Sequence, residues 1–257
     1  SGTILCGTGG AMCSETVNHG TTRTLSATPG ANSVFAGWSL PECPGTGPCV
    51  VSITSDVTVV ALFERAPHVL TVAKGGTGTG TVVSNVAGIS CGADCDEAYL
   101  HGDVILLTAT ASADSDFTGW SGAGCGMSMQ CMVTLNQAQT VTAQFTLKQY
   151  TLTVTKPGNG AGTVASTPTG IQCGATCNAS YSHGAMVTLT ATPSTGSDFT
   201  GWDGACTGTG DCVVTMDQVR SVSATFTLRQ YTLTVTRNGT GTGTVSSTPA
   251  GVTCGAS

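Results

Sequence analysis

The chain has 257 residues, with 8 basic and 14 acidic side chains and a formal charge of −6. This charge leaves no basic surface to neutralise phosphates, so no nucleic acid partner is predicted. The longest apolar run covers residues 59–63. It is far shorter than the ~20 residues that span a bilayer, so no membrane insertion is expected in this segment. Thirteen cysteines with only 9% charged residues are typical of a secreted protein.

The predicted elements recur along the chain at a step of 81 or 82 residues. His19, His101 and His183 each lie 82 residues apart, and Gln149–Thr155 returns as Gln230–Thr236. This periodicity predicts tandem repeats. In chain order, they are a partial repeat that lacks its first strands (residues 1–66), two complete repeats (67–148 and 149–229), and the opening strands of a further repeat (230–257).

Within a repeat, apolar residues alternate with threonine and serine. Tyr150, Leu152 and Val154 are separated by threonines, and this period of two is typical of half-buried antiparallel strands. Strands are expected over residues 152–155, 162–166, 185–192, 212–216 and 221–228, with Gly-rich turns between them. An all-β unit of ~80 residues has a thin core, so it is expected to need covalent support.

The cysteines are predicted to provide that support as local disulfides. Each complete repeat contains a Cys-x3-Cys and a Cys-x5-Cys motif. Four cysteines allow three connectivities, and a zinc site of four thiolates or a redox pair are the alternatives, disfavoured by the spacing. The expected pairs are Cys6 with Cys13, Cys43 with Cys49, Cys91 with Cys95, Cys125 with Cys131, Cys173 with Cys177 and Cys206 with Cys212, which leaves Cys254 unpaired.

A Phe-x-Gly-Trp motif occurs in three copies and is predicted to fill the small cores. Its glycine is expected to permit a close approach or a β-bulge. The alternative is an exposed indole that stacks on a sugar, but each repeat has only one Trp to fill its core. The predicted core aromatic residues are Phe35, Trp38, Phe117, Trp120, Phe199 and Trp202.

No residue pattern predicts catalysis, a cofactor or a metal site. His101 and His183 stand before a glycine without a recurring acid or nucleophile, so they are interpreted as turn residues. The loop acids Asp114 and Asp116 become Gly196 and Asp198 in the next repeat and Asn32 and Val34 in the first, and this change of oxygen ligands argues against a calcium cage. A recurring isopeptide cross-link is not predicted either, because Lys74 corresponds to Arg237 in a later repeat and arginine cannot form that bond. The chain is therefore not expected to be an enzyme.

The order of these motifs resembles the divergent InlB B-repeat family. The resemblance rests on Tyr-Thr-Leu-Thr-Val-Thr, Gly-x-Gly-Thr-Val, Cys-Gly-x-x-Cys, Phe-Thr-Gly-Trp and Cys-x5-Cys, and it covers essentially the whole chain. It implies large secreted or cell-surface bacterial proteins and β-grasp-like units, with no catalytic residues. The expected fold is all-β, with β-grasp-like or small sandwich units in disulfide-bonded repeats of ~82 residues that form an elongated rod.

The expected function is a structural segment of an extracellular bacterial fibre, stalk or surface protein. The chain is interpreted as a window on a longer array, whose partners are flanking repeats or copies of itself. One alternative is an adhesive or glycan-binding array that contacts a surface glycan or protein. The other is a filament subunit that polymerises head-to-tail by strand complementation between residues 230–257 and residues 1–66.

Overall fold

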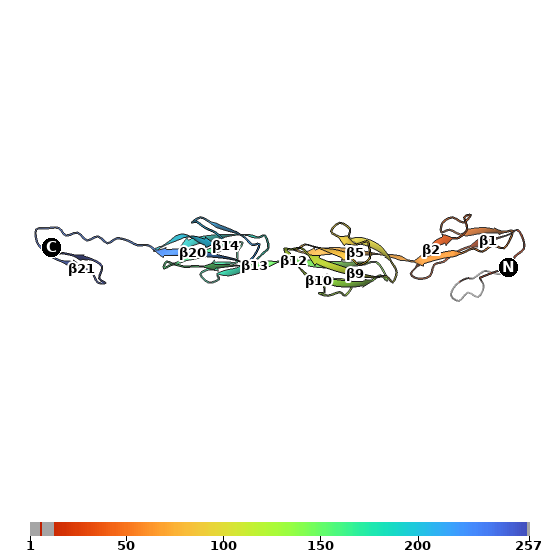
Figure 1. The fold of residues 1–257 in the computed structure, drawn as a ribbon, viewed down its shortest axis with the longest axis horizontal. Coiled ribbons are helices and arrows are strands. Elements are labelled where there is room, and N and C mark those ends of the chain that lie inside the picture. Colours follow the sequence, from red (N-terminus) through yellow and green to blue (C-terminus); the bar gives the residue numbers. More distant parts are fainter. Residues whose placement is uncertain (1–5, 7–12, 256–257) are drawn as a thin grey trace. The chain divides into compact units, whose positions relative to one another are not determined.

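The computed structural model describes residue 6 and residues 13–255, and every regular element in this part of the chain is a β-strand (Figure 1). None of the described residues forms a helix long and apolar enough to cross a membrane. The chain divides between Lys148 and Gln149 into two compact units, and each is described by itself below.

The second repeat is a sandwich of two four-stranded sheets. One sheet has the order β10-β12-β5-β8 and the other β11-β9-β6-β7. All neighbouring strands are antiparallel except β5 and β12, the first and last strands of the repeat, which pair in parallel at the centre of their sheet. The strands are β5 (Pro67–Gly76), β6 (Gly80–Ser84), β7 (Ser90–Cys91), β8 (Asp96–Leu100), β9 (Val104–Ala111), β10 (Ser115–Ser121), β11 (Gln130–Thr134) and β12 (Gln139–Leu147).

The third repeat has the same two sheets, in the orders β16-β13-β20-β18 and β15-β14-β17-β19. Its opening strand again pairs in parallel with its closing strand, and Val154 lies opposite Val222. The strands are β13 (Gln149–Thr155), β14 (Gly162–Thr167), β15 (Gln172–Cys173), β16 (Asn178–Ser182), β17 (Met186–Pro193), β18 (Ser197–Gly204), β19 (Cys212–Thr215) and β20 (Arg220–Leu228).

The core of each complete repeat lies between its two sheets. In the third repeat, Leu152 and Val154 from one sheet pack in the same buried cluster as Val187 and Leu189 from the other. Alternate residues along these strands are buried, and this explains why apolar residues and threonines alternate in the sequence. Each sheet of the sandwich contributes one apolar face to the core. The core is therefore thicker than that of a single sheet with one covered face.

The described part of the first repeat contains two two-stranded sheets, and the end of the chain contains a short hairpin. In the first repeat β1 pairs with β3 and β2 with β4, around a small cluster of Cys43, Cys49 and Val51. In the hairpin, β21 pairs with β22. The strands are β1 (Thr21–Leu25), β2 (Ser33–Trp38), β3 (Cys49–Ile53), β4 (Ala61–Arg65), β21 (Val245–Ser246) and β22 (Thr253–Cys254).

Three strands of the third repeat were not predicted by the alternation. β15 has only two residues, and β16 has the sequence Asn-Ala-Ser-Tyr-Ser, which is too polar to show a clear apolar period. β18 contains a register shift between Phe199 and Gly201. This shift is a β-bulge, and a bulge interrupts the period of two on which the prediction depends.

Candidate functional site

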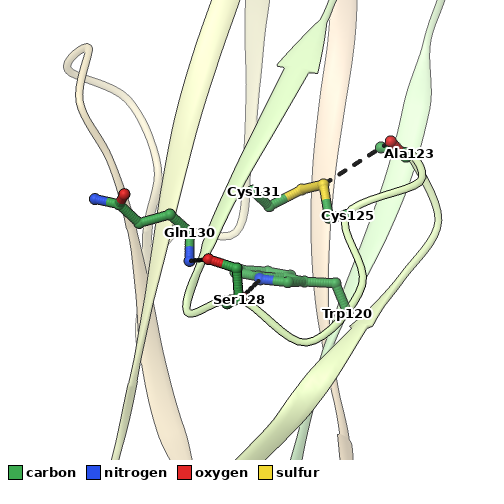
Figure 2. Close-up of a disulfide and its surroundings, with 6 residues drawn as sticks. All are labelled: Trp120, Ala123, Cys125, Ser128, Gln130 and Cys131. Carbon is green, nitrogen blue, oxygen red and sulfur yellow. Dashed lines mark hydrogen bonds between the residues drawn. A yellow bond between two sulfur atoms is a disulfide. The ribbon is translucent and has the colours of Figure 1, made fainter.

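A frame made of one tryptophan and one disulfide recurs in every repeat. In the second repeat, Cys125 is bonded to Cys131, and Figure 2 shows this disulfide lying over the indole of Trp120. The indole Nε1 donates a hydrogen bond of 2.8 Å to the carbonyl oxygen of Ser128 in the same loop. The disulfide thus closes the segment from Cys125 in this loop to Cys131 in β11, and the indole binds the same segment at Ser128.

The glycine of the Phe-x-Gly-Trp motif allows this loop to approach the strand. Gly119 lies at the β-bulge between β10 and β12 with a φ of 136°, in the region that favours glycine. A Cβ added to it would lie 3.1 Å from the carbonyl oxygen of Gly126, which accepts a 2.7 Å hydrogen bond from the backbone N–H of Trp120. The predicted bulge and close approach are both confirmed.

The same frame is present in the other two repeats. The indole of Trp202 donates to the carbonyl oxygen of Gly210 at 2.6 Å, and that of Trp38 donates to Gly47 at 2.7 Å. Trp120 and Trp202 are only 8% and 5% exposed, whereas Trp38 is half-buried. A buried indole whose N–H is already bonded to the backbone offers no face to a sugar.

The three phenylalanines of the motif are only partly buried. Phe117, Phe199 and Phe35 pack edge-on against the tryptophan of the same motif, with ring centroids 4.9–5.4 Å apart. In the complete repeats they come from β10 and β18, which are edge strands of their sheets. An edge strand has a neighbour on one side only, so these rings are covered on one side.

Sequence reasoning did not single out the phenylalanine that is most deeply buried in each complete repeat. Phe145 and Phe226 come from the closing strand and are 0% and 1% exposed. A Cβ on Gly80 would lie 2.3 Å from the Phe145 ring, and one on Gly162 would lie 2.2 Å from the Phe226 ring. The signal that could have found them is the glycine at the start of the second strand, which leaves room for the ring.

A second disulfide in each complete repeat lies next to the opening strand of that repeat. Cys91 is fully buried and bonded to Cys95, whose carbonyl oxygen accepts a 2.7 Å hydrogen bond from the backbone N–H of Val72. The third repeat has the same contact between Cys177 and Val154. The structure contains six disulfides, Cys6–Cys13, Cys43–Cys49, Cys91–Cys95, Cys125–Cys131, Cys173–Cys177 and Cys206–Cys212, and Cys254 is a free thiol.

Charged and imidazole side chains gather where the first repeat passes into the second. Arg65, at the end of β4, donates hydrogen bonds to the carbonyl oxygen of His101 at 2.8 Å and to the carboxylate of Asp103 at 2.6 Å. The guanidinium holds the pKa of Asp103 below its usual value. His68 Nε2 lies 3.2 Å from His101 Nδ1. His101 lies in a turn, as expected, and its imidazole contacts the ring of His68.

Two lysines and one arginine near the strand ends bond to residues in other strands of their own repeats. Lys74 and Lys156 donate to the carbonyl oxygens of Gly80 and Gly162, at 3.3 and 2.8 Å. Arg229 pairs with Asp198 at 2.8 Å, and this carboxylate raises the pKa of the guanidinium. Among the described residues, no three His, Cys, Asp or Glu side chains are grouped to hold a metal ion.

Comparisons with solved structures find bacterial proteins at low similarity. The TIE protein of Bacillus anthracis matches with 9% identity and a TM-score of 0.40, over 80% of this chain and 42% of that one. The major pilin T-13 of Streptococcus pyogenes matches with 8% identity and a TM-score of 0.29, over 63% and 97% of the two chains. The minor pilin GBS52 of Streptococcus agalactiae matches with 8% identity and a TM-score of 0.25, over 66% and 100%.

The sequence itself gives a specific family match. No curated protein matches the chain. The profile of the divergent InlB B-repeat domain, in contrast, matches three times in succession, over residues 2–67, 69–149 and 150–230. These matches cover most of the chain and follow the period of the disulfide and tryptophan frames. The chain therefore belongs to the divergent InlB B-repeat family, of which it carries three tandem copies.

Proposed function

We propose that this chain is a structural segment of an extracellular bacterial fibre, stalk or surface protein, and that it serves as a spacer. The observation that carries the proposal is the connection between repeats. β4 ends at Arg65 and β5 begins at Pro67, while β12 ends at Leu147 and β13 begins at Gln149. A single residue separates consecutive repeats, and such a connection leaves little slack for a hinge.

The connecting residues are also held by the repeat that they leave. The backbone N–H of Ala66 donates to Asn32, and that of Lys148 donates to Asp114, each at 2.9 Å. The Nζ of Lys148 donates to Ala113 in the same loop at 2.8 Å. These hydrogen bonds restrict the φ and ψ of the connecting residues on the side of the repeat that they leave, as expected of a spacer.

Disulfides support the extracellular location, because they persist outside the cell and are rare in a reducing cytosol. The family relation supports it too, since it implies secreted and surface proteins. In the complete repeats, the cysteines and the tryptophan are used to close a small sandwich. These residues therefore support a mechanical role for the repeats rather than a chemical one.

Small-angle X-ray scattering of the dilute, purified chain tests the spacer role. A compact chain of this length would have a radius of gyration of about 18 Å. Three units in line, each about as long as a nine-residue strand of ~30 Å, would give about 25 Å or more. A value near that of a compact chain would contradict the proposal.

An adhesive role is favoured by one observation in the first repeat alone. Val34, Val60 and Leu62 are 37%, 54% and 53% exposed, and Trp38 lines an open hollow of about 360 Å³ with the last two. The corresponding positions of the second repeat carry Asp116, Thr142 and Gln144. If this apolar face binds a surface glycan or protein, Leu62→Thr should reduce retention on a glycan array or on immobilised surface proteins. Equal retention of both forms would remove this second role.

A further inference from the structure

We propose that residues 127–132 of the second repeat, here called the methionine segment, are a modification site at which thioethers consume two-electron oxidants such as hypochlorous acid. The segment joins the loop after β10 to β11, and it contains Met127, Met129 and Met132, the three methionines of this repeat. The proposal goes beyond the spacer role, because it gives the second repeat a chemical function that the other repeats do not share.

All three thioether side chains of the segment are open to solvent. Met127, Met129 and Met132 are 86%, 63% and 67% exposed, whereas Met216 in the core of the third repeat is 0% exposed. A dissolved oxidant reaches a sulfur atom only where the side chain is accessible, and exposure is one of the factors that decide which sulfur is oxidised. The segment is therefore expected to react before the buried methionine.

The corresponding segments of the other repeats contain no methionine. Residues 43–50 and 206–213 have the same disulfide and bind the indole in the same way, but they carry no thioether. Thr46 and Thr209 precede the carbonyl group that binds the indole, and Met127 has this place in the second repeat. The frame of tryptophan and disulfide thus forms without methionine, so its structure does not account for the three thioethers.

The segment is held by contacts that do not involve its thioethers. The carbonyl oxygen of Ser128 accepts from the indole of Trp120 (Figure 2), and the carbonyl oxygen of Met129 accepts from the backbone N–H of Ala109 at 2.9 Å. The disulfide closes the same segment. Oxidation makes a methionine side chain polar, which disrupts a core. On these exposed side chains it leaves the contacts of the loop in place.

The reaction is balanced for each thioether. The sulfur forms a bond to oxygen and gives up two electrons, the O–Cl bond of hypochlorous acid breaks, chlorine leaves as chloride, and one proton passes to water. The product is methionine sulfoxide, which methionine sulfoxide reductases convert back to the thioether. Since the segment contains three methionines, it takes up three molecules of oxidant per chain.

The groups that benefit are the oxidisable side chains inside the sandwiches. Trp120, Trp202 and Met216 are 8%, 5% and 0% exposed. The polarisable sulfur of an exposed thioether reacts with hypochlorous acid faster than an indole ring does. The oxidant is therefore consumed at the surface first. This protection depends on the number of exposed thioethers, and it requires no contact between a thioether and the group that is protected.

A triple variant removes the thioethers without changing the fold. Met127→Leu, Met129→Leu and Met132→Leu conserve side-chain volume at exposed positions, so the stability should stay nearly the same. Met216→Leu is the matched control, because it removes a thioether that is fully buried. The other oxidisable groups of the chain are the same in both variants, so their uptake of oxidant cancels in the comparison.

The experiment is a titration of the full chain with hypochlorous acid, followed by peptide mass spectrometry and tryptophan fluorescence. In the unchanged chain we expect sulfoxide in the methionine segment before it appears at Met216. Fluorescence loss should begin about three equivalents of oxidant earlier in the triple variant and at the same point in Met216→Leu. Oxidation of the segment no sooner than Met216, or the same onset in the triple variant as in the unchanged chain, would overturn the proposal. Neither result would affect the spacer role.

Discussion

In each complete repeat a glycine lies directly against the ring of a buried phenylalanine. Gly162 stands at the start of β14, and its Cα faces the ring of Phe226 from the closing strand of the other sheet. The ring is 1% exposed because a hydrogen atom, and not a side chain, lies against it. This contact links the beginning and the end of the repeat, so it reports on whether the whole sandwich is closed.

Replacing this glycine should destabilise the third repeat. A Cβ at residue 162 would lie 2.2 Å from Phe226 Cε1, and such overpacking of a core costs about 1–3 kcal/mol. Gly162→Ala should lower the free energy of unfolding of this repeat by that amount in urea, followed by tryptophan fluorescence. Gly210→Ala is the control with open space. Equal unfolding curves for the two variants would show that the contact is absent in solution.

At the scale of the element, two short covalent loops hold each complete repeat together. Cys206–Cys212 closes the loop that carries the backbone partner of Trp202, and Cys173–Cys177 connects β15 to the turn before β16. A bridge over so few residues acts mainly by restricting the unfolded chain, and by that relation each contributes about 2–3 kcal/mol. A thin sandwich depends on such contributions.

Removal of one bridge should therefore be measurable without loss of the fold. The double substitution Cys206→Ala and Cys212→Ala should lower the unfolding free energy of the third repeat by about 2–3 kcal/mol. It should also increase hydrogen exchange at the N–H of Trp202, whose partner is the loop carbonyl of Gly208. The second repeat, with its own Cys125–Cys131 bridge, serves as the internal control. An unchanged third repeat would contradict the stabilising role of the disulfide.

The turn after β8 should show a pH dependence that originates in Asp103. Arg65 lowers the pKa of this carboxyl in the folded chain. The stabilising contribution is therefore fully present above the unfolded value of about 4 and is lost as the pH falls through the lower folded pKa. The unfolding midpoints of the unchanged chain and Asp103→Asn should differ at pH 6 and converge only when the pH falls below the lowered pKa of Asp103 in the folded chain. A difference that persists at low pH would point to another cause.

The sequence was sufficient for the elements that obey a simple period. The alternation in Tyr150–Thr155 and in 221–228 predicted two strands correctly, because each buries every second residue. It could not show that these strands pair in parallel, since they lie some 70 residues apart and register depends on tertiary packing. β18 was missed because the bulge at Gly201 breaks its period, although the same glycine correctly predicted the bulge.

The frame was predictable to a similar extent. The Cys and Trp positions were visible from their recurrence, but the hydrogen bonds from the indoles of Trp120 and Trp202 to loop carbonyls were not. These bonds depend on a loop whose sequence differs between repeats, Gly-Met-Ser-Met-Gln in one and Thr-Gly-Thr-Gly-Asp in the other. A backbone carbonyl is present whatever the side chain, so the contact is kept while the residues change.

At the scale of the whole molecule, the chain is a series of B-repeats joined by single residues. Contacts in a repeat array are largely confined to each unit and its neighbours, so stability is close to a sum over units. A substitution in one complete repeat should therefore leave the other nearly unaffected. The role that we propose, a disulfide-bonded spacer outside the cell, depends most on the oxidation state of the cysteines.

The most direct test is a titration of free thiols in the denatured, unreduced chain after secretion. The chain has 13 cysteines, and the structure joins twelve of them in six disulfides. We expect one reactive thiol per chain, from Cys254, and 13 after reduction. Thirteen thiols before reduction, or thiols that react only after a chelator has removed a metal, would contradict both the covalent support of the sandwich and the extracellular role.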